Sequence, residues 1–416
     1  MRLLILGLNY APEQVGIAVY TTGMAEALAA AGHEVRVIAG QPYYPSWRVP
    51  EGFRRWAPDV SIENGVRITR VPHYVPSVQS GWRRLLHQAS FAASALLPAI
   101  WSGLAWRPDL VLAIAPSMTS APVARLAAAL AGAHSWLHIQ DFEVDAAFAT
   151  GLLDAHRGLG ALARWFEAGV LHSFERISAI SPEMCQRLAG KGVPKDRISE
   201  FRNWADTNVR PMSGPSPFRE QWDIRTEHVA LYSGNIGNKQ GIGIVLDAAR
   251  LLQHRRDLTF VICGEGSERQ RLMARGVDLG NVRFCNLQPQ GRLHDLMGLA
   301  TVHLLPQAAG VADLMLPSKL TNMLASGRPV IATSAPGTGL TREVDGCGLT
   351  VPPGDALAFA DAIERLVDDE ALRATTSSAA RRRAEERWAK TAILGSLDMD
   401  LARLTSRAAA PSAPVA

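Results

Sequence analysis

Cysteine is scarce in this 416-residue sequence, and its placement excludes two common uses of the residue. The four cysteines, at positions 185, 263, 285 and 347, have neither CxxC spacing nor a companion histidine cluster. We therefore expect buried thiols in a reducing compartment rather than disulfides or metal ligands.

A large excess of one charge is also lacking. The formal net charge is +4, too small on a chain of this length to favour nucleic acid as a partner, although a basic face could still meet an anionic surface. No secretory signal is apparent either, because the first apolar run stops at Gly7 and Asn9 and suits a buried strand better. We therefore expect a cytoplasmic protein.

What is present is typical of an α/β enzyme. Hydrophobic residues make up 47% of the chain and charged residues 20%, and 35 glycines allow many tight strand-to-helix turns. The length predicts two domains of roughly 200 residues each. Strand and helix patterns alternate through both halves, so we predict two Rossmann-like domains, each a doubly wound parallel sheet.

The first half opens with a βαβ pattern. Apolar runs at residues 3–6 and 33–39 flank a loop and a helix expected over 17–31. Gly16 precedes this helix, where the absence of a β-carbon would let a ligand approach the backbone. The loop has one glycine where the GxGxxG motif has three, which disfavours a nicotinamide dehydrogenase.

Polar residues gather at the carboxyl end of the strand expected at 135–139, where parallel sheets place their chemistry. They are His138, Gln140, Asp141, Glu143 and Asp145. Either this loop carries catalytic groups, or it is structural and Asp141 caps the element that follows.

Two other first-half segments suit an acceptor. The loop over residues 42–56 mixes aromatic rings, prolines and arginines, so it is either plain coil or a lip for sugars and phosphates. Residues 85–106 contain no Asp, Glu, Lys or Arg and could span a bilayer by length. Because Gln88 and Pro98 dilute this run and a strand of the same sheet follows, we expect a helix at a domain face. Our preferred function for its outer side is contact with a membrane or a lipid-linked substrate.

The second half contains three candidate phosphate-binding turns. Glycine-rich turns at residues 234–237 and 264–266 each follow an apolar strand, and Lys239 lies just beyond the first. In the third, Pro317, Ser318 and Lys319 begin a helix expected to stop at Gly327, which is either an anion site or a capped surface helix. Together they predict a diphosphate site, with the two lysines in place of a divalent metal. No DxD pair suggests a metal, and we expect no cofactor.

We place the first domain at residues 1–206 and the second at 207–380, with a Pro, Gly and Ser cluster at 207–218 as the linker. A helix over 381–405 is expected to cross back to the first domain. Residues 406–416 have low complexity and are predicted to be disordered.

The order of motifs resembles the retaining family-4 glycosyltransferases of GT-B fold, in particular the bacterial exopolysaccharide group that includes the colanic acid enzymes. The resemblance is carried by NYAPEQVGIAVYTTGM, LHIQDFEVDAAF, AISPEM, NWADTN, YSGNIGNKQG, CGEGSE and PSKLTNMLASGRPVIAT. It implies two Rossmann-like domains facing across a cleft. It also implies a nucleotide-sugar donor, held mostly by the second domain, and a lipid-linked oligosaccharide acceptor at the inner membrane surface.

The resemblance also assigns donor-binding residues. Asn235, Lys239, Ser318 and Lys319 would contact the diphosphate or the nearby sugar, and Leu287 lies in the turn that would hold the nucleobase. Gly264 and Glu265 would line the same pocket, and Gly16 would approach the leaving phosphate from the first domain.

This chain departs from the family pattern at two places. Many relatives carry two glutamates, one near the donor sugar and one near the ribose, where Leu314 and Asn322 stand here. Asp313 is a candidate substitute for the first, and Asn322 is a donor-binding candidate at the second position. Relatives also often have histidine directly before the first-domain aspartate, where this chain has Gln140. The catalytic assignment therefore stays open between Asp141 and His138.

The resemblance implies sugar transfer with retention of the anomeric configuration, drawn in this family as front-face attack, and it favours GDP-fucose as the donor. One alternative is a nucleotide-sugar epimerase of the same fold. Another is a non-catalytic scaffold in polysaccharide assembly, which the two missing glutamates keep open.

Overall fold

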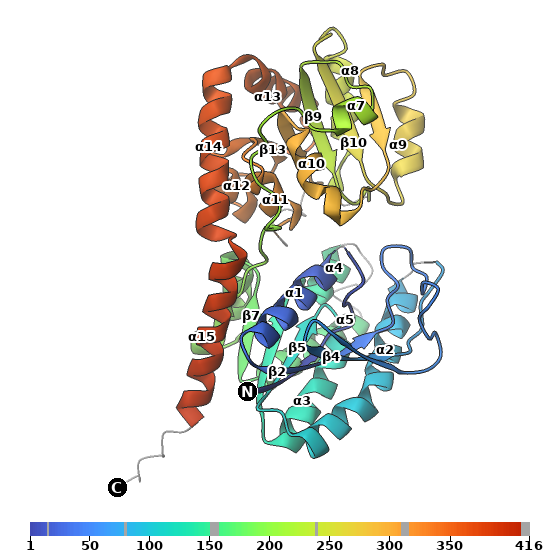
Figure 1. Cartoon of the computed structure of the whole chain (residues 1–416), viewed down its shortest axis with the longest axis vertical. Helices are drawn as coiled ribbons and strands as arrows, with labels where there is room; N and C mark the ends of the chain where they lie inside the picture. Colours follow the sequence, from blue (N-terminus) through green and yellow to red (C-terminus); the bar gives the residue numbers. More distant parts are fainter. Residues whose placement is uncertain (15, 79–80, 150–157, 238–239, 309–315, 409–416) are drawn as a thin grey trace. The chain divides into compact units, whose positions relative to one another are not determined.

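The computed structural model describes residues 1–14, 16–78, 81–149, 158–237, 240–308 and 316–408. The chain forms two compact units (Figure 1). The first unit contains Met1–Arg202 and the segment from Leu394 onward, and the second contains Asn203–Ile393.

The first unit is built on an eight-stranded sheet in the order β3-β4-β2-β1-β5-β6-β7-β8. Its neighbouring strands are parallel except for the pair β3 and β4, which is antiparallel. The strands are β1 (Arg2–Leu6), β2 (Glu34–Gly40), β3 (Asp59–Glu63), β4 (Val66–Val71), β5 (Leu110–Ala115), β6 (His134–Ile139), β7 (Arg176–Ala179) and β8 (Ile198–Glu200). Every residue of β5 is buried, as expected for a central strand covered on both faces.

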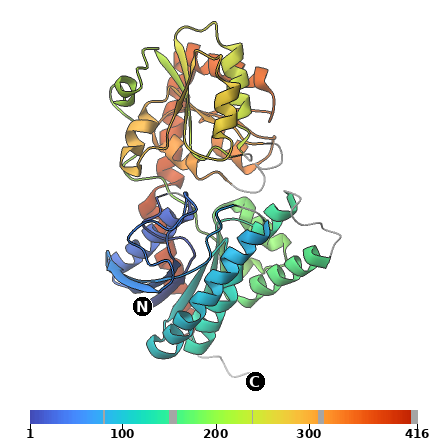
Figure 2. The same cartoon turned by 90° about the vertical axis from the view of Figure 1, so that its right-hand side faces the viewer.

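Helices cover this sheet, and the longest of them is α2, the light-blue helix at the front of the lower unit in Figure 2. They are α1 (Ile17–Ala30), α2 (Gly81–Trp101), α3 (Ala121–Ala131), α4 (Glu143–Ala149), α5 (Gly158–Ser173) and α6 (Pro182–Gly190). Local sequence sets their ends. The hydroxyl of Ser181 accepts the N–H of Met184 and Pro182 fills the first helical position, so α6 begins there.

The second unit is built on a six-stranded parallel sheet in the order β11-β10-β9-β12-β13-β14. Its strands are β9 (His228–Ser233), β10 (Leu258–Cys263), β11 (Val282–Cys285), β12 (Val302–Leu305), β13 (Val330–Thr333) and β14 (Gly348–Val351). Its helices are α7 (Phe218–Gln221), α8 (Gly243–Leu251), α9 (Arg269–Arg275), α10 (Leu293–Gly298), α11 (Lys319–Ala325), α12 (Gly339–Val344), α13 (Ala356–Asp368) and α14 (Glu370–Arg387).

The sheet of the second unit separates two hydrophobic cores. Val229 and Leu231 of β9 face one core, and Ala230 and Tyr232 face the other. This alternation is the period of a strand, and burial on both sides explains its unbroken apolar run. Both units are therefore doubly wound parallel sheets of the Rossmann type, as the sequence predicted.

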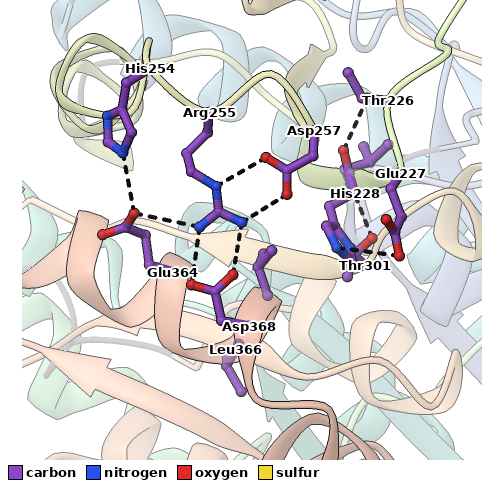
Figure 3. Close-up of polar contacts among 12 residues, drawn as sticks. Thr226, Glu227, His228, His254, Arg255, Asp257, Thr301, Glu364, Leu366 and Asp368 are labelled. Atoms are coloured by element: carbon purple, nitrogen blue, oxygen red, sulfur yellow. Dashed lines mark hydrogen bonds and ion pairs between the residues drawn. The ribbon is translucent and has the colours of Figure 1, made fainter.

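An ion-pair network ties β10 to α13 at the amino end of the strand (Figure 3). The guanidinium of Arg255 lies 2.7 Å from a carboxylate oxygen of Asp257 and 2.7 Å from one of Asp368. Hydrogen bonds from Arg255 lower the pKa of Asp257 to about 2. Asp257 immediately precedes β10, so this clamp lies at the end of the sheet opposite the strands' carboxyl termini.

Two sequence-based boundaries need correction. Residues 207–218 are not a linker, because Val209 and Phe218 are buried in a core of the second unit. The chain passes between the units at Arg202 and Asn203 instead.

The helix expected over 381–405 is in fact two helices. The first part belongs to α14, which ends at Arg387, and α15 (Lys390–Ala408) follows after a break at Trp388, whose side chain is buried in a core of the second unit. Beyond the break, the carboxylate of Asp398 lies 2.9 Å from His33 of the first unit. The helix also continues past residue 405, where the sequence analysis placed the disordered tail, and residues 409–416 lie outside the described residues.

Candidate functional site

The strongest site candidate lies where the strand order of the second sheet reverses. β9 and β12 are parallel neighbours, and the strands that follow each of them along the chain lie on opposite sides of this pair. The connections leaving their carboxyl ends therefore diverge, and such switch points are where open α/β sheets bind ligands. Lys319, the first residue of α11, reaches this place from the connection after β12.

The ammonium of Lys319 meets the end of β9. Its Nζ atom lies 2.9 Å from the hydroxyl of Tyr232 and 4.3 Å from the centre of that ring. The same hydroxyl donates to the carbonyl oxygen of Asn235 at 2.6 Å. A β-carbon at Gly234 would stand 3.3 Å from Nζ, so glycine at this position leaves room for the lysine.

Lys319 has no carboxylate partner among the described residues. Burial lowers the pKa of its ammonium to about 7, and in the described part of the chain this group contacts a phenol and no carboxylate. A partly buried charge without a counter-ion is costly unless a ligand supplies the opposite charge. The arrangement can therefore hold an anion at the switch point.

The two glycine-rich turns use several of their backbone N–H groups within the protein. The N–H groups of Gly234, Ile236 and Gly264 donate to Cys263, Glu265 and Cys285 respectively. These three donors are taken up within the protein and are not available to a phosphate. The glycines at 264 and 266 instead permit backbone contact between neighbouring turns.

Other predicted donor residues lie near the same edge of the sheet. Ser318 is exposed and, within the described residues, makes no capping hydrogen bond, while Leu287 is 40% exposed. Glu265 pairs with Arg269 at 3.8 Å, and the side-chain carbonyl of Asn322 accepts the N–H of Asp206 at 2.7 Å.

Three residues of the sequence analysis cannot be placed. Lys239, Asp313 and Leu314 lie outside the described residues. Their predicted roles therefore stay predictions.

Two residues at this edge escaped the sequence analysis. Arg269 donates to the side chain of Asn286 at 2.8 Å and to the carbonyl of Gly264 at 3.2 Å, joining the turns after β10 and β11. Tyr232 holds Lys319. Neither carried a usable signal, because an arginine in a helix is usually solvated and a tyrosine in an apolar strand usually belongs to the core.

In the first unit, Gly16 occupies the position expected from its sequence. It precedes α1 with φ of 67° and ψ of −143°, a conformation suited to glycine. A β-carbon there would lie 4.0 Å from the ring of Tyr44, with no closer contact among the described residues outside its chain neighbours. The backbone at Gly16 is thus open to a ligand, unlike that at Gly264.

The structure separates the two candidate catalytic residues. His138 is 1% exposed, its Nδ1 atom lies 2.9 Å from the hydroxyl of Ser178, and its ring packs on Phe201. Burial lowers the pKa of His138 to about 3, so the ring is neutral in the core. Asp141 follows the carboxyl end of β6 and is partly exposed. Asp141 is therefore the better placed of the two for contact with a substrate.

Glu143, two residues further on, is a partly buried acid. It begins α4 and accepts a hydrogen bond from the amide of Gln88 on α2. Burial raises the pKa of Glu143 to about 8, and the charge of Asp141 acts in the same direction. The end of β6 and the start of α4 thus bring together two acids, of which Glu143 is mostly protonated at pH 7.

Helix α2 has one buried and one exposed face. Phe91, Ala95 and Ala99 pack into the core, while Leu97 and Trp101 are 76% and 71% exposed. Residues Gly81–Trp106 form the one stretch of the described chain that is helical, long and apolar enough to cross a membrane. Such a stretch is weak evidence of a span, because core helices of soluble proteins have the same length and composition.

Two doubly wound units in one chain, with a partly buried lysine at the switch point of the second sheet, are the arrangement of the GT-B fold. Solved structures agree on the fold. The chain is similar over 98% of its length to sucrose-phosphate synthase from Thermosynechococcus elongatus, of which it covers 99%, at a TM-score of 0.76 and 19% identity. It is similar over 97% of its length to all of Anabaena Alr3699/HepE, solved with UDP and glucose, at a TM-score of 0.70 and 16% identity.

Sequence comparisons place the chain more closely. The family described as "Glycosyl transferase 4-like domain" matches residues 15–204, and "Glycosyl transferases group 1" matches residues 227–369. WcaI of Escherichia coli K12, named as a colanic acid biosynthesis glycosyl transferase, is 40% identical over 348 residues, which are 80% of this chain and 83% of the relative. The protein belongs to the family-4 glycosyltransferases, and the resemblance seen in its motifs is confirmed.

Proposed function

We propose that this enzyme transfers a sugar from a nucleoside-diphosphate donor to a lipid-linked oligosaccharide in exopolysaccharide biosynthesis, with the anomeric configuration retained. The similarity to a protein named for colanic acid biosynthesis supports the pathway. The observation that carries the donor class is the ammonium of Lys319 at the switch point of the second sheet, which has no carboxylate partner in the described part of the chain. A diphosphate is the anion that a sugar donor brings to such a place.

The proposed chemistry relies on electrostatic stabilisation. As the bond between the sugar and the diphosphate breaks, negative charge grows on the departing phosphate, and a positioned cation stabilises it. Lys319 supplies that charge, together with Lys239 if the family assignment holds. In the front-face scheme the leaving phosphate takes the acceptor proton, so no metal or cofactor is needed. Asp141 would orient the reacting hydroxyl.

The donor is tested by thermal unfolding with GDP, UDP, ADP and their sugars. A ligand present at 100 times its dissociation constant raises the free energy of unfolding of the domain that binds it by about 2.7 kcal/mol. We expect one base to stabilise the protein, and the subgroup resemblance favours GDP-fucose. Lys319→Ala should weaken this stabilisation and reduce turnover at least tenfold, which corresponds to about 1.4 kcal/mol. Full activity in Lys319→Ala would reject the donor site.

The same incubations separate the alternative functions. Labelled donor that is converted to another nucleotide sugar without any acceptor would identify an epimerase. Protein that neither binds nor hydrolyses any donor would point to the scaffold. Transfer to a lipid extract, with the product's anomeric configuration determined by NMR, would establish the proposed reaction.

Peripheral contact with an anionic membrane surface completes the proposal. It is supported by the exposed apolar side of α2 and by Arg83 and Arg84 near its start. The test is co-flotation with vesicles containing anionic lipid. We expect the double variant Leu97→Gln, Trp101→Gln to lose flotation, while Leu251→Gln, a change to an exposed leucine of the second unit, should keep it.

A further inference from the structure

Tyr232 makes more contacts than a core residue needs. Its ring is buried in one of the two cores of the second unit, a role that phenylalanine would fill equally well. Its hydroxyl, however, accepts from Lys319 at 2.9 Å and donates to the carbonyl oxygen of Asn235 at 2.6 Å. One phenol thus connects the end of β9, the turn after it and the start of α11.

The contact with Lys319 constrains the ammonium. A lysine side chain has several rotatable bonds and three N–H donors, so an unsupported ammonium would occupy many positions. Here one donor is taken by the Tyr232 hydroxyl, and the ring face lies 4.3 Å from Nζ, which favours the charge. In the described part of the chain, Tyr232 is the titratable group that faces Lys319. The remaining N–H donors are left for a ligand.

We propose that Tyr232 is a positioning residue of the donor site, which fixes the ammonium of Lys319 and directs its remaining protons toward the donor diphosphate. The inference rests on the proposed function, because it takes the anion at this site to be the donor's diphosphate. It adds a residue that acts through Lys319 and does not itself touch the substrate.

A pH dependence follows from this role. The pKa of Lys319 without ligand is lowered to about 7, and a bound diphosphate would raise it. Affinity is therefore full below pH 7 and falls as the pH rises through that value, by up to tenfold per unit, because binding then requires proton uptake. Removing the Tyr232 hydroxyl removes an acceptor that favours the charged lysine. This decline in affinity should then begin at lower pH, by about one unit or more.

The experiment compares wild type with Tyr232→Phe by titration calorimetry with GDP, UDP and ADP between pH 6 and pH 9. At pH 7.5 we expect about tenfold weaker binding in the variant, on the scale of one charge-assisted hydrogen bond. The difference should shrink toward pH 6. The number of protons taken up on binding is measured in buffers of different ionisation enthalpy. The pH range over which this uptake occurs should be lower in Tyr232→Phe than in wild type. Adding Tyr232→Phe to Lys319→Met should cause no further loss.

The matched control is Tyr10→Phe. Tyr10 is another buried tyrosine, but it lies in the first unit and its hydroxyl has no partner among the described residues. This variant should bind like wild type at every pH. If Tyr232→Phe proves too unstable, global 3-fluorotyrosine labelling of the six tyrosines weakens the hydroxyl as an acceptor without removing it, and should shift the decline in the same direction.

Each outcome decides the inference. Equal binding by wild type and Tyr232→Phe overturns it and leaves the proposed function standing. So does a further loss of affinity when Tyr232→Phe is added to Lys319→Met, because that would place the effect in the Asn235 turn rather than in Lys319. No binding of any of the three nucleotides by wild type overturns both the inference and the proposed donor class.

Discussion

A β-carbon added to Gly264 would stand 1.9 Å from the carbonyl oxygen of Gly234. The turns after β10 and β9 are therefore in backbone contact, and the N–H of Gly264 donates to Cys285 on the other side. This contact sets the shape of the sheet edge at which we propose the donor site.

Gly264→Ala should consequently destabilise the second unit. Because the clash is with backbone, the strands must move apart, at a cost of about 3 kcal/mol or more. A domain of this size would lose roughly 6 °C or more in Tm. The measurement is thermal unfolding of the full chain. Gly280→Ala is the control, since no atom lies within 4 Å of its β-carbon position. Equal Tm values for Gly264→Ala and Gly280→Ala would show that the turns at Gly264 and Gly234 are not in close backbone contact.

Asp141 and His138 should respond differently to substitution. Asp141→Asn removes the carboxylate at the end of β6, so we expect at least a tenfold loss of turnover with little change in Tm. His138→Leu removes a buried ring that bonds Ser178, so we expect a Tm lowered by several degrees, with turnover per folded molecule within about threefold of wild type. The measurements are initial rates well below either Tm, together with thermal unfolding.

The pH profile provides a second check on this pair. The pKa of His138 is lowered to about 3, so the ring stays neutral and cannot shape the activity profile between pH 5 and pH 8. If the pH dependence of activity between pH 5 and pH 8 is lost in His138→Leu, then His138 rather than Asp141 is the catalytic residue.

Glu143 should make stability fall as the pH rises. Its pKa is raised from 4.5 to about 8 in the folded protein, so the fold holds the neutral acid. Above pH 4.5 the unfolded chain releases this proton and the folded chain does not, which favours unfolding until the pH reaches about 8. Glu143→Gln cannot ionise, so its Tm should exceed that of wild type by a margin that grows from pH 5 to pH 8.

The control for Glu143→Gln is Glu51→Gln, at an exposed glutamate of the same unit. Its Tm should follow that of wild type at every pH. A margin that stays constant between pH 5 and pH 8 would mean that Glu143 is already ionised in the fold.

The Arg255 network in Figure 3 should contribute stability that acid removes. Asp257 has its pKa lowered to about 2, so its contribution is complete above the usual value near 3.8 and is lost as the pH falls through about 2. We expect Arg255→Ala to cost about 1–2 kcal/mol at neutral pH, a small figure because Asp257 and Asp368 are partly exposed.

The difference between wild type and Arg255→Ala, measured by thermal unfolding, should shrink between pH 4 and pH 2. Arg225→Ala is the matched control, because Arg225 and Asp223 form an ion pair that is 87% and 70% exposed. This variant should keep the wild-type Tm. An equal loss in the two variants would show that burial of the network adds nothing.

The sequence was informative where one residue type serves one physical purpose. The apolar runs at residues 3–6 and 33–39 predicted buried strands, and β1 and β2 lie there. The sequence was ambiguous where one residue type can serve either of two structural roles. Glycine permits close approach of a phosphate or of a neighbouring backbone, and the structure finds open space at Gly16 and a crowded turn at Gly264.

Other features were out of reach because they depend on partners far along the chain. Strand β3 has no buried residue and lacks the apolar run of a core strand, so it was overlooked. His138 and Asp141 are three positions apart, and burial against Ser178 and Phe201, which only the fold reveals, separates them. The contact between Tyr232 and Lys319 spans 87 positions, and no local pattern announces it.

The return of α15 to the first unit has a consequence for biosynthesis. Leu397 and Leu401 are buried, and the helix is tied to the first unit through His33 and Arg176. A ribosome makes this helix after the second unit, so the first unit stays unfinished until the whole second unit has been translated. A fragment ending at residue 202 would expose the apolar surface on which α15 packs and would be prone to aggregation. In a circular permutant beginning at residue 394, this helix would be made first.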